Sequence, residues 1–126
     1  TACSNTAYGF NALKLTTLGD DNTAIGSYAL ATNVSGIRNT AIGYKTLYAN
    51  IGSYNQAFGF QALCTNTTGC TNTGLGGNAL RYNTTGCRNT GFGSHALGNT
   101  TTGGRNTAIG QAALYTNTTG TCNILQ

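Results

Sequence analysis

Apolar and polar residues follow one another along the chain in a pattern that recurs about every 17 residues. The pentapeptide NTAIG or a close variant occupies residues 5–9, 22–26, 39–43, 55–59, 72–76, 89–93 and 106–110. Aligning the copies gives the unit N-T-A-φ-G-x-x-A-L-x-x-N-T-T-G-x-x, in which φ is a large apolar residue. The apolar positions lack the 3.6-residue spacing of a helix, and two glycines in every unit disfavour a helix further. The pattern therefore predicts an all-β chain.

A repeat of this length is typical of a parallel β-solenoid (a β-helix or β-roll), in which each unit forms one coil. We expect a single solenoid domain over residues 1–126 with about seven coils. Unit positions 1–4 and 6–10 predict two short strands, the glycine at position 5 a bend, and positions 11–17 a return turn. Complete units begin at Asn5, Asn22, Asn39, Asn55, Asn72, Asn89 and Asn106, and a partial unit begins at Asn123.

Stacked coils place residues of the same unit position in columns, spaced about 4.8 Å apart. We expect the large residues at position 4 and the leucines at position 9 to form buried core ladders, and the asparagines at positions 1 and 12 to form amide ladders. The small residues at positions 3 and 8 would then face a neighbouring solenoid. The predicted core ladders are Ile25, Ile42, Phe58, Leu75, Phe92 and Ile109 at position 4, and Leu13, Leu30, Leu47, Leu63, Leu80, Leu97 and Leu114 at position 9.

Two large apolar side chains per coil make a thin core, which favours self-association into an oligomer or an end-to-end filament. Only 6% of the residues are charged, and the net charge is +4. These charges are too dispersed for a nucleic-acid partner. No apolar run approaches the ~20 residues of a membrane span, so membrane insertion is not expected. Five cysteines in a small chain indicate an extracellular or cell-surface location. No signal peptide is visible and the first residue is Thr1, which we interpret as a mature product or a segment of a longer chain.

The run NTAIG followed by ALxxNTTG resembles the low-complexity repeats of bacterial and phage fibre proteins. It is also similar to the SVAIGxxA repeats in the heads of YadA-type trimeric autotransporter adhesins. The resemblance spans the whole chain and implies an extracellular fibre or stalk. In the adhesin heads, the repeats wind as left-handed parallel β-rolls and three chains associate. The family offers no catalytic residues to transfer.

Five N-x-[ST] sequons fall in the expected return turns, where a surface acceptor for an N-glycan would lie. The adjacent threonines could carry O-glycans instead, and asparagine and threonine are also ordinary turn residues. The glycosylation candidates are Asn33, Asn66, Asn83, Asn99 and Asn117.

Cys70 and Cys87 share unit position 16 in neighbouring coils, which predicts Cα atoms about 5 Å apart and a disulfide within the chain. Cys3 and Cys122 lie in the terminal coils and would approach each other if chains stack end to end, which predicts a disulfide between chains. Cys64, at position 10, could be free, buried or bonded to a neighbouring chain. No CxxC or Cys/His spacing indicates a metal site.

The remaining polar residues indicate no catalytic site and no cofactor, so we expect a protein that is not an enzyme. His95 has no acid in its unit, and the only acids, Asp20 and Asp21, lie in one return turn. Asp21 and Arg38 share position 17 and could form an exposed ion pair. Phe10, Tyr44 and Phe60 at position 6 could line a sugar-binding face or simply pack.

We interpret the chain as a structural segment of an extracellular filament, with return turns that present polar surface and the glycosylation candidates. One alternative is an adhesin or phage tail-fibre segment that binds surface glycans. A second is an ice-binding (antifreeze) protein that uses the threonine column at position 2. Ice-binding faces usually carry Thr-x-Thr in each coil, however, and position 2 stands alone here.

Overall fold

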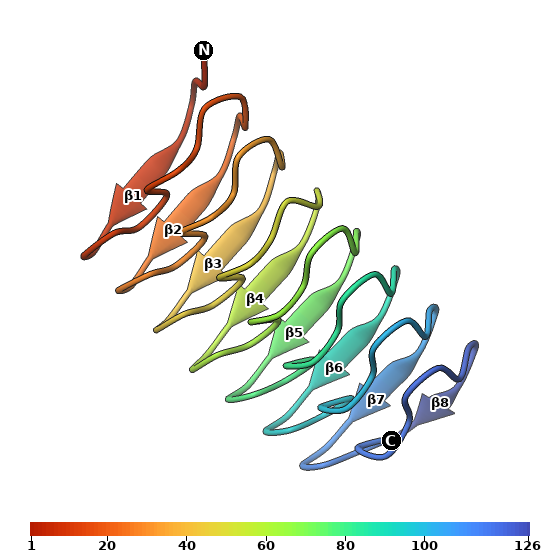
Figure 1. Ribbon diagram of the computed structural model, residues 1–126. Helices are drawn as coiled ribbons and strands as arrows, with labels where there is room; N and C mark the ends of the chain where they lie inside the picture. Colours follow the sequence, from red (N-terminus) through yellow and green to blue (C-terminus); the bar gives the residue numbers. More distant parts are fainter.

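The computed structural model describes residues 1–126 as an all-β parallel solenoid that winds one coil for each repeat (Figure 1). Each coil contributes one short strand, and eight strands form one parallel sheet in chain order. The two termini lie at opposite ends of the rod. The chain has no helix that could cross a lipid bilayer. The strands are β1 Thr6–Tyr8, β2 Thr23–Ile25, β3 Thr40–Ile42, β4 Gln56–Phe58, β5 Thr73–Leu75, β6 Thr90–Phe92, β7 Thr107–Ile109 and β8 Ile124–Leu125.

The strands pair in the register that the repeat predicts. Thr23 of β2 lies beside Thr40 of β3, and Ile25 lies beside Ile42. The third unit is one residue short, yet β3 and β4 keep the same register, with Ala41 beside Ala57. The missing residue is therefore absorbed outside the strand, in the return turn.

The leucine ladder at position 9 is confirmed. Five of its members are fully buried: Leu30, Leu47, Leu63, Leu80 and Leu97. Leu13 and Leu114, in the first and last complete coils, are partly buried and pack against the same core. A leucine in this column lies on the leucines of the coils above and below it, so only the end coils expose theirs.

The predicted core ladder at position 4 is wrong. Ile25, Phe92 and Ile109 are exposed, and Ile42, Phe58 and Leu75 are only half-buried. The buried strand residue is instead at position 3, where Ala24, Ala41, Ala57 and Ala108 have no exposed surface. The asparagine at position 1 points inward, and successive strand residues point to opposite faces, so position 3 also points inward and position 4 points out. The expectation that positions 3 and 8 face a neighbouring solenoid is therefore wrong: position 3 faces the interior, and the position-8 residues Ala29, Ala62, Ala79 and Ala96, which lie outside the strands, are also fully buried.

The second predicted strand, at positions 6–10, is also wrong, because this segment forms two consecutive turns. In the first coil the N–H of Ala12 donates to the carbonyl of Gly9, and the N–H of Thr16 donates to that of Leu13. Residues at positions 7 and 9 take left-handed φ angles, such as 57° at Asn11 and 51° at Leu13. The turns still bond to the next coil, because the N–H of Leu13 donates to the carbonyl of Ala29 (3.1 Å).

The glycine at position 5 brings successive coils into backbone contact. Gly59 has a φ of 130°, and a Cβ atom there would lie 2.7 Å from the carbonyl carbon of Gly76 in the next coil. A side chain is therefore excluded both by the backbone conformation and by the close approach. Gly110 has a similar φ of 123° but meets nothing within 4 Å.

The amide ladder at position 1 is confirmed and runs through the interior. The backbone N–H of Asn39 donates to Oδ1 of Asn22 (2.9 Å), and Nδ2 of Asn39 donates to the carbonyl of Gly52 (2.9 Å). The same pattern recurs from Asn5 to Asn123. Each buried amide thus joins two coils and also closes its own coil, which satisfies polar groups that a narrow core would otherwise leave unpaired.

Candidate functional site

The outer face of the sheet consists of unit positions 2 and 4, and we call it the outer sheet face. Its position-2 column is threonine in six of the seven complete units, with Gln56 as the exception. Its position-4 column holds large apolar side chains, and Tyr8 (77%), Phe92 (55%) and Ile109 (44%) are the most exposed of these. A row of hydroxyls therefore lies beside a row of bulky apolar groups.

An aromatic cluster extends this apolar surface beside the first four coils. Phe10, Tyr28, Tyr44 and Phe60 form a continuous series in which successive ring centroids lie 5.5, 6.4 and 5.6 Å apart. The ammonium of Lys45 lies 5.4 Å from the centroid of Tyr44, within cation–π range. The later coils carry Gly77, Ser94 and Gln111 at the same unit position as Tyr44.

Unit positions 16 and 17 form a second row, mostly half-buried at position 16 and exposed at position 17, which we call the return edge. Here the structure brings together the predicted pair Cys70 and Cys87, whose sulfurs lie 2.8 Å apart. Burial, followed by the hydrogen bond with the Cys70 side chain, raises the pKa of the Cys87 thiol. The two thiols are in place for a disulfide, and the covalent bond itself stays a prediction. Burial also raises the pKa of Cys64, which has no sulfur partner.

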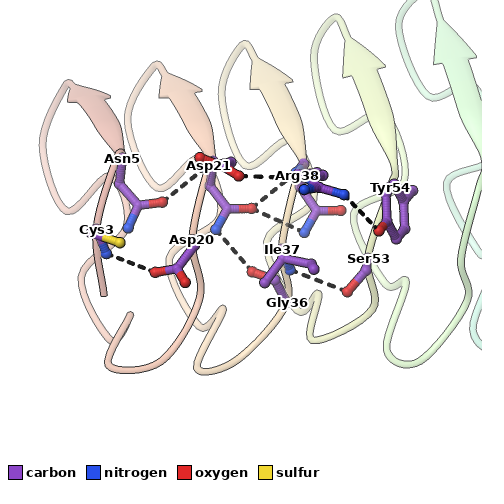
Figure 2. Close-up of polar contacts among 11 residues, drawn as sticks. Cys3, Asn5, Asp20, Asp21, Gly36, Ile37, Arg38, Ser53 and Tyr54 are labelled. Atoms are coloured by element: carbon purple, nitrogen blue, oxygen red, sulfur yellow. Dashed lines mark hydrogen bonds and ion pairs between the residues drawn. The ribbon is translucent and has the colours of Figure 1, made fainter. Parts of the chain in front are cut away.

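The return edge is acidic near the N-terminus (Figure 2). The backbone N–H of Cys3 donates to Oδ1 of Asp20 (2.7 Å), and this bond lowers the pKa of the Asp20 carboxyl. The predicted pair of Asp21 and Arg38 is confirmed at 3.5 Å, between two exposed side chains. The guanidinium of Arg38 also donates to the Tyr54 hydroxyl (3.0 Å), and this bond, followed by Asp21, raises the Arg38 pKa.

The return edge is basic near the C-terminus, where the chain has its one pocket, a groove of about 300 Å³. Gly104 lines the groove between the residues of the two neighbouring coils at its unit position, Cys87 and Thr121. Neither Arg88 nor Arg105 makes an ion pair within the chain, because its two acids lie at the other end. The lining residues are Cys87, Arg88, Thr102, Gly104, Arg105, Thr121 and Cys122.

Three of the five glycosylation candidates are wrong for the folded chain. Asn33, Asn66 and Asn83 occupy position 12 and are fully buried. Nδ2 of Asn66 donates to Oδ1 of Asn50 (2.6 Å), so this column is a second amide ladder of the interior. Asn117 occupies the same column in the last complete coil, where it is partly buried. Asn99 is also partly buried but lies one residue outside the column, because Thr100 takes the inward position.

No three His, Cys, Asp or Glu side chains gather closely enough to hold a metal ion. His95 lies on the surface, and its Nδ1 is 2.9 Å from the Ser94 hydroxyl. Asp20 and Asp21 lie at the far end of the rod from the arginine-lined groove. The chemically distinctive surfaces are therefore the outer sheet face, the aromatic cluster and the return edge.

Sequence reasoning missed the outer sheet face and the arginine groove. One signal for the first was present: position 3 holds only alanine or glycine, whereas position 4 ranges from isoleucine to phenylalanine and tyrosine. A position that accepts only small side chains is closely packed, whereas a position that accepts side chains of different sizes is exposed. The groove combines residues from three successive coils, and nothing in the repeat distinguishes them from ordinary turn residues.

Comparison with known proteins gives no match: no protein-family model, no curated protein and no solved structure is significantly similar to this chain.

Proposed function

We propose that the protein is a structural segment of an extracellular filament, in which rods associate side by side through their outer sheet faces. The observation that carries this proposal is the exposed apolar column at position 4. Contiguous apolar surface of this kind typically marks an interaction site. The interior is complete without these side chains, because leucine, alanine and asparagine already fill it.

A second copy of the chain is the partner that this column fits best. Its apolar groups recur once per coil, and a neighbouring rod repeats with the same spacing. Two such columns interdigitate along their whole length, as in the dry interfaces between stacked sheets. Burying a large apolar side chain contributes about 1.5–3 kcal/mol, so even partial burial of seven of them gives a stable contact.

The cysteines support the extracellular part of the proposal. Two of the five lie with their sulfurs 2.8 Å apart, and disulfides persist mainly in oxidising compartments. The low proportion of charge also agrees with a surface that is covered in an assembly, because charged residues are depleted in interface cores.

Electron microscopy of the purified chain tests the proposal. We expect elongated bundles for the wild type and dispersed short rods for the double variant Phe58→Thr/Phe92→Thr. A matched control is Leu18→Thr/Ile51→Thr, which removes exposed apolar surface from another side of the rod and should leave the bundles intact. Dispersed rods for the wild type at high concentration would contradict the proposal.

Glycan binding is a second candidate, and the aromatic cluster of the first four coils favours it. Exposed aromatic rings beside a cation are a common surface for sugar rings that carry acidic groups. Binding to acidic polysaccharides that is lost in Phe10→Ala/Phe60→Ala would support this function. The threonine column at position 2 is the one feature that favours ice binding. Thermal hysteresis of the purified chain would measure this activity directly.

A further inference from the structure

The two ends of the return edge mirror each other in chemical order. Near the N-terminus a thiol, Cys3, is followed one coil later by the acids Asp20 and Asp21. Near the C-terminus the base Arg105 is followed one coil later by a thiol, Cys122. Both cysteines are exposed and neither is within bonding reach of another sulfur of its own chain. In chain order, the edge therefore begins with thiol and acid and finishes with base and thiol.

Each end lacks the partner that the other end offers. Asp21 forms a single ion pair, with the Arg38 guanidinium at 3.5 Å. The Asp20 carboxylate accepts a hydrogen bond from the N–H of Cys3. Arg105 forms no ion pair with an acid of its own chain and lines the groove of about 300 Å³. Opposite charges at the two ends of one surface favour a second copy that runs in the opposite direction.

We propose that two copies of the chain pair along their return edges in antiparallel orientation, with Asp21 of each against Arg105 of the other and Cys3 of each against Cys122 of the other. This inference rests on the proposed filament function and gives that filament a second lateral contact, distinct from the outer sheet face. Parallel copies in register would instead place acid against acid and base against base.

The register of the pair follows from the repeat. Cys3 lies one coil before Asp21, and Cys122 lies one coil after Arg105, so one antiparallel alignment satisfies both contacts at once. The two-fold symmetry repeats the contacts at the other end. The same alignment sets Arg38 opposite Arg88, a repulsive contact that Asp21 partly relieves because it already binds Arg38. Arg88 is therefore not expected to stabilise the pair.

A disulfide then locks the docked pair. Each Cys3 and Cys122 thiol loses one proton and one electron as the S–S bond forms, and a small-molecule disulfide accepts them and is reduced to two thiols. The hydrogen bond and negative charge of Asp20 raise the pKa of the Cys3 thiol, which slows its reaction in the free chain. Arg105 of the partner offsets that negative charge, so docking favours the reactive thiolate.

Oxidation of the full chain with oxidised glutathione, followed by non-reducing electrophoresis and tryptic mass spectrometry, tests the proposal. Trypsin releases Cys3 in residues 1–14 and Cys122 in residues 106–126, and each peptide has one cysteine. Because the termini lie at opposite ends of the rod, a link between these peptides joins two chains. We expect this link in a band that stops at the dimer.

Charge variants separate the proposed contact from chance collision. Arg105→Asp should slow dimer formation about tenfold, because both symmetry-related contacts become repulsive. Arg88→Asp is the matched control, since it makes the same charge change one coil away. Because Arg88 faces Arg38 of the partner, this variant should leave the rate unchanged or raise it. The charge swap Asp21→Arg/Arg105→Asp should restore the rate.

Three results would overturn the pairing: links of Cys3 to Cys3, an Arg105→Asp rate equal to wild type, or a ladder of trimers and larger species, which is what end-to-end stacking predicts. Microscopy of the same samples keeps the two proposals apart. Bundles without the Cys3–Cys122 link would reject the pairing alone, whereas linked dimers that form no bundles would reject the filament alone.

Discussion

The inward and outward columns of one strand differ in burial, in side-chain bonding and in how much their residues vary, although these residues are neighbours in sequence. Asn72 at position 1 is fully buried and bonds to two other coils, whereas Thr73 beside it is half-buried and bonds to none through its side chain. The inward columns hardly vary from coil to coil because every coil must match its neighbour. The outward columns are free to vary. Shape is therefore specified inside the rod, and recognition is specified outside it.

The sharpest test of the inward rule is the glycine at position 5. Gly59→Ala should destabilise the rod by about 4 kcal/mol or more, because the new Cβ meets the backbone of the next coil. Gly110→Ala adds the same group at a similar φ but into open space, and should cost about 1–3 kcal/mol from backbone strain alone. Thermal or urea unfolding measures both, and equal losses would show that strain outweighs the contact between coils.

A smaller effect on stability should distinguish Asn72, which precedes β5, from Thr73, the first residue of β5. Asn72→Ala leaves the N–H of Asn89 without its partner and removes one of the two bonds to the carbonyl of Gly86, which keeps its bond from Nδ2 of Asn83. These losses should cost about 3 kcal/mol. Thr73→Ala should change the free energy of unfolding by no more than about 0.5 kcal/mol. Similar losses in urea titrations of the two variants would remove the distinction between inward and outward columns.

Cys70 and Cys87 are placed for a link between two coils along the return edge. Oxidation of Cys70 and Cys87 closes a loop of about 17 residues and should stabilise the chain by about 3 kcal/mol. The disulfide should appear as a link between tryptic peptides 46–81 and 82–88, and reducing agent should lower the melting temperature. Cys70→Ser should abolish that sensitivity, and a wild type indifferent to reductant would show that the bond does not form.

Completing an inward column should stabilise the rod. Oδ1 of Asn83 is buried without a partner, because the next coil offers Thr100 in place of an asparagine. Thr100→Asn supplies an amide donor and should raise stability by about 1 kcal/mol. Thr84→Asn, one residue outside the ladder, is a control that should give no gain. A loss in Thr100→Asn would mean that the bond from the Thr100 hydroxyl to the Asn117 carbonyl matters more.

The smallest effect concerns an outward group, Asp20. Its pKa is lowered in the folded chain by the N–H of Cys3, so its contribution to stability is complete above its ordinary pKa and disappears as the pH falls through the lower folded value. Asp20→Asn should therefore lower the melting temperature slightly at pH 7 and leave it unchanged near pH 2. A difference that persists in acid would indicate a cause other than ionisation.

The repeat alone predicted the solenoid, the register of its coils and the leucine and amide ladders, because each needs only identical residues at identical spacing. It did not predict which strand face is buried. That choice depends on the Asn22 amide, which reaches across the coil to the carbonyl of Gly36 and so turns Ala24 inward. The left-handed φ of Leu30 could not be predicted from the sequence either, because leucine rarely adopts that conformation. Local propensity predicted a strand there, and the packing of adjacent coils imposed a turn.

Six amides of the two interior ladders point the same way along the rod. At position 1, Nδ2 of Asn39, Asn72, Asn106 and Asn123 each donates to Oδ1 of the preceding coil, and Asn66 and Asn83 do the same at position 12. Aligned amide groups add their electric dipoles, as peptide groups do in a helix, with the positive end toward the N-terminus. A single rod should therefore orient in an electric field, which transient birefringence records. An antiparallel pair cancels the moment, so the optical signal should fall as pairs form.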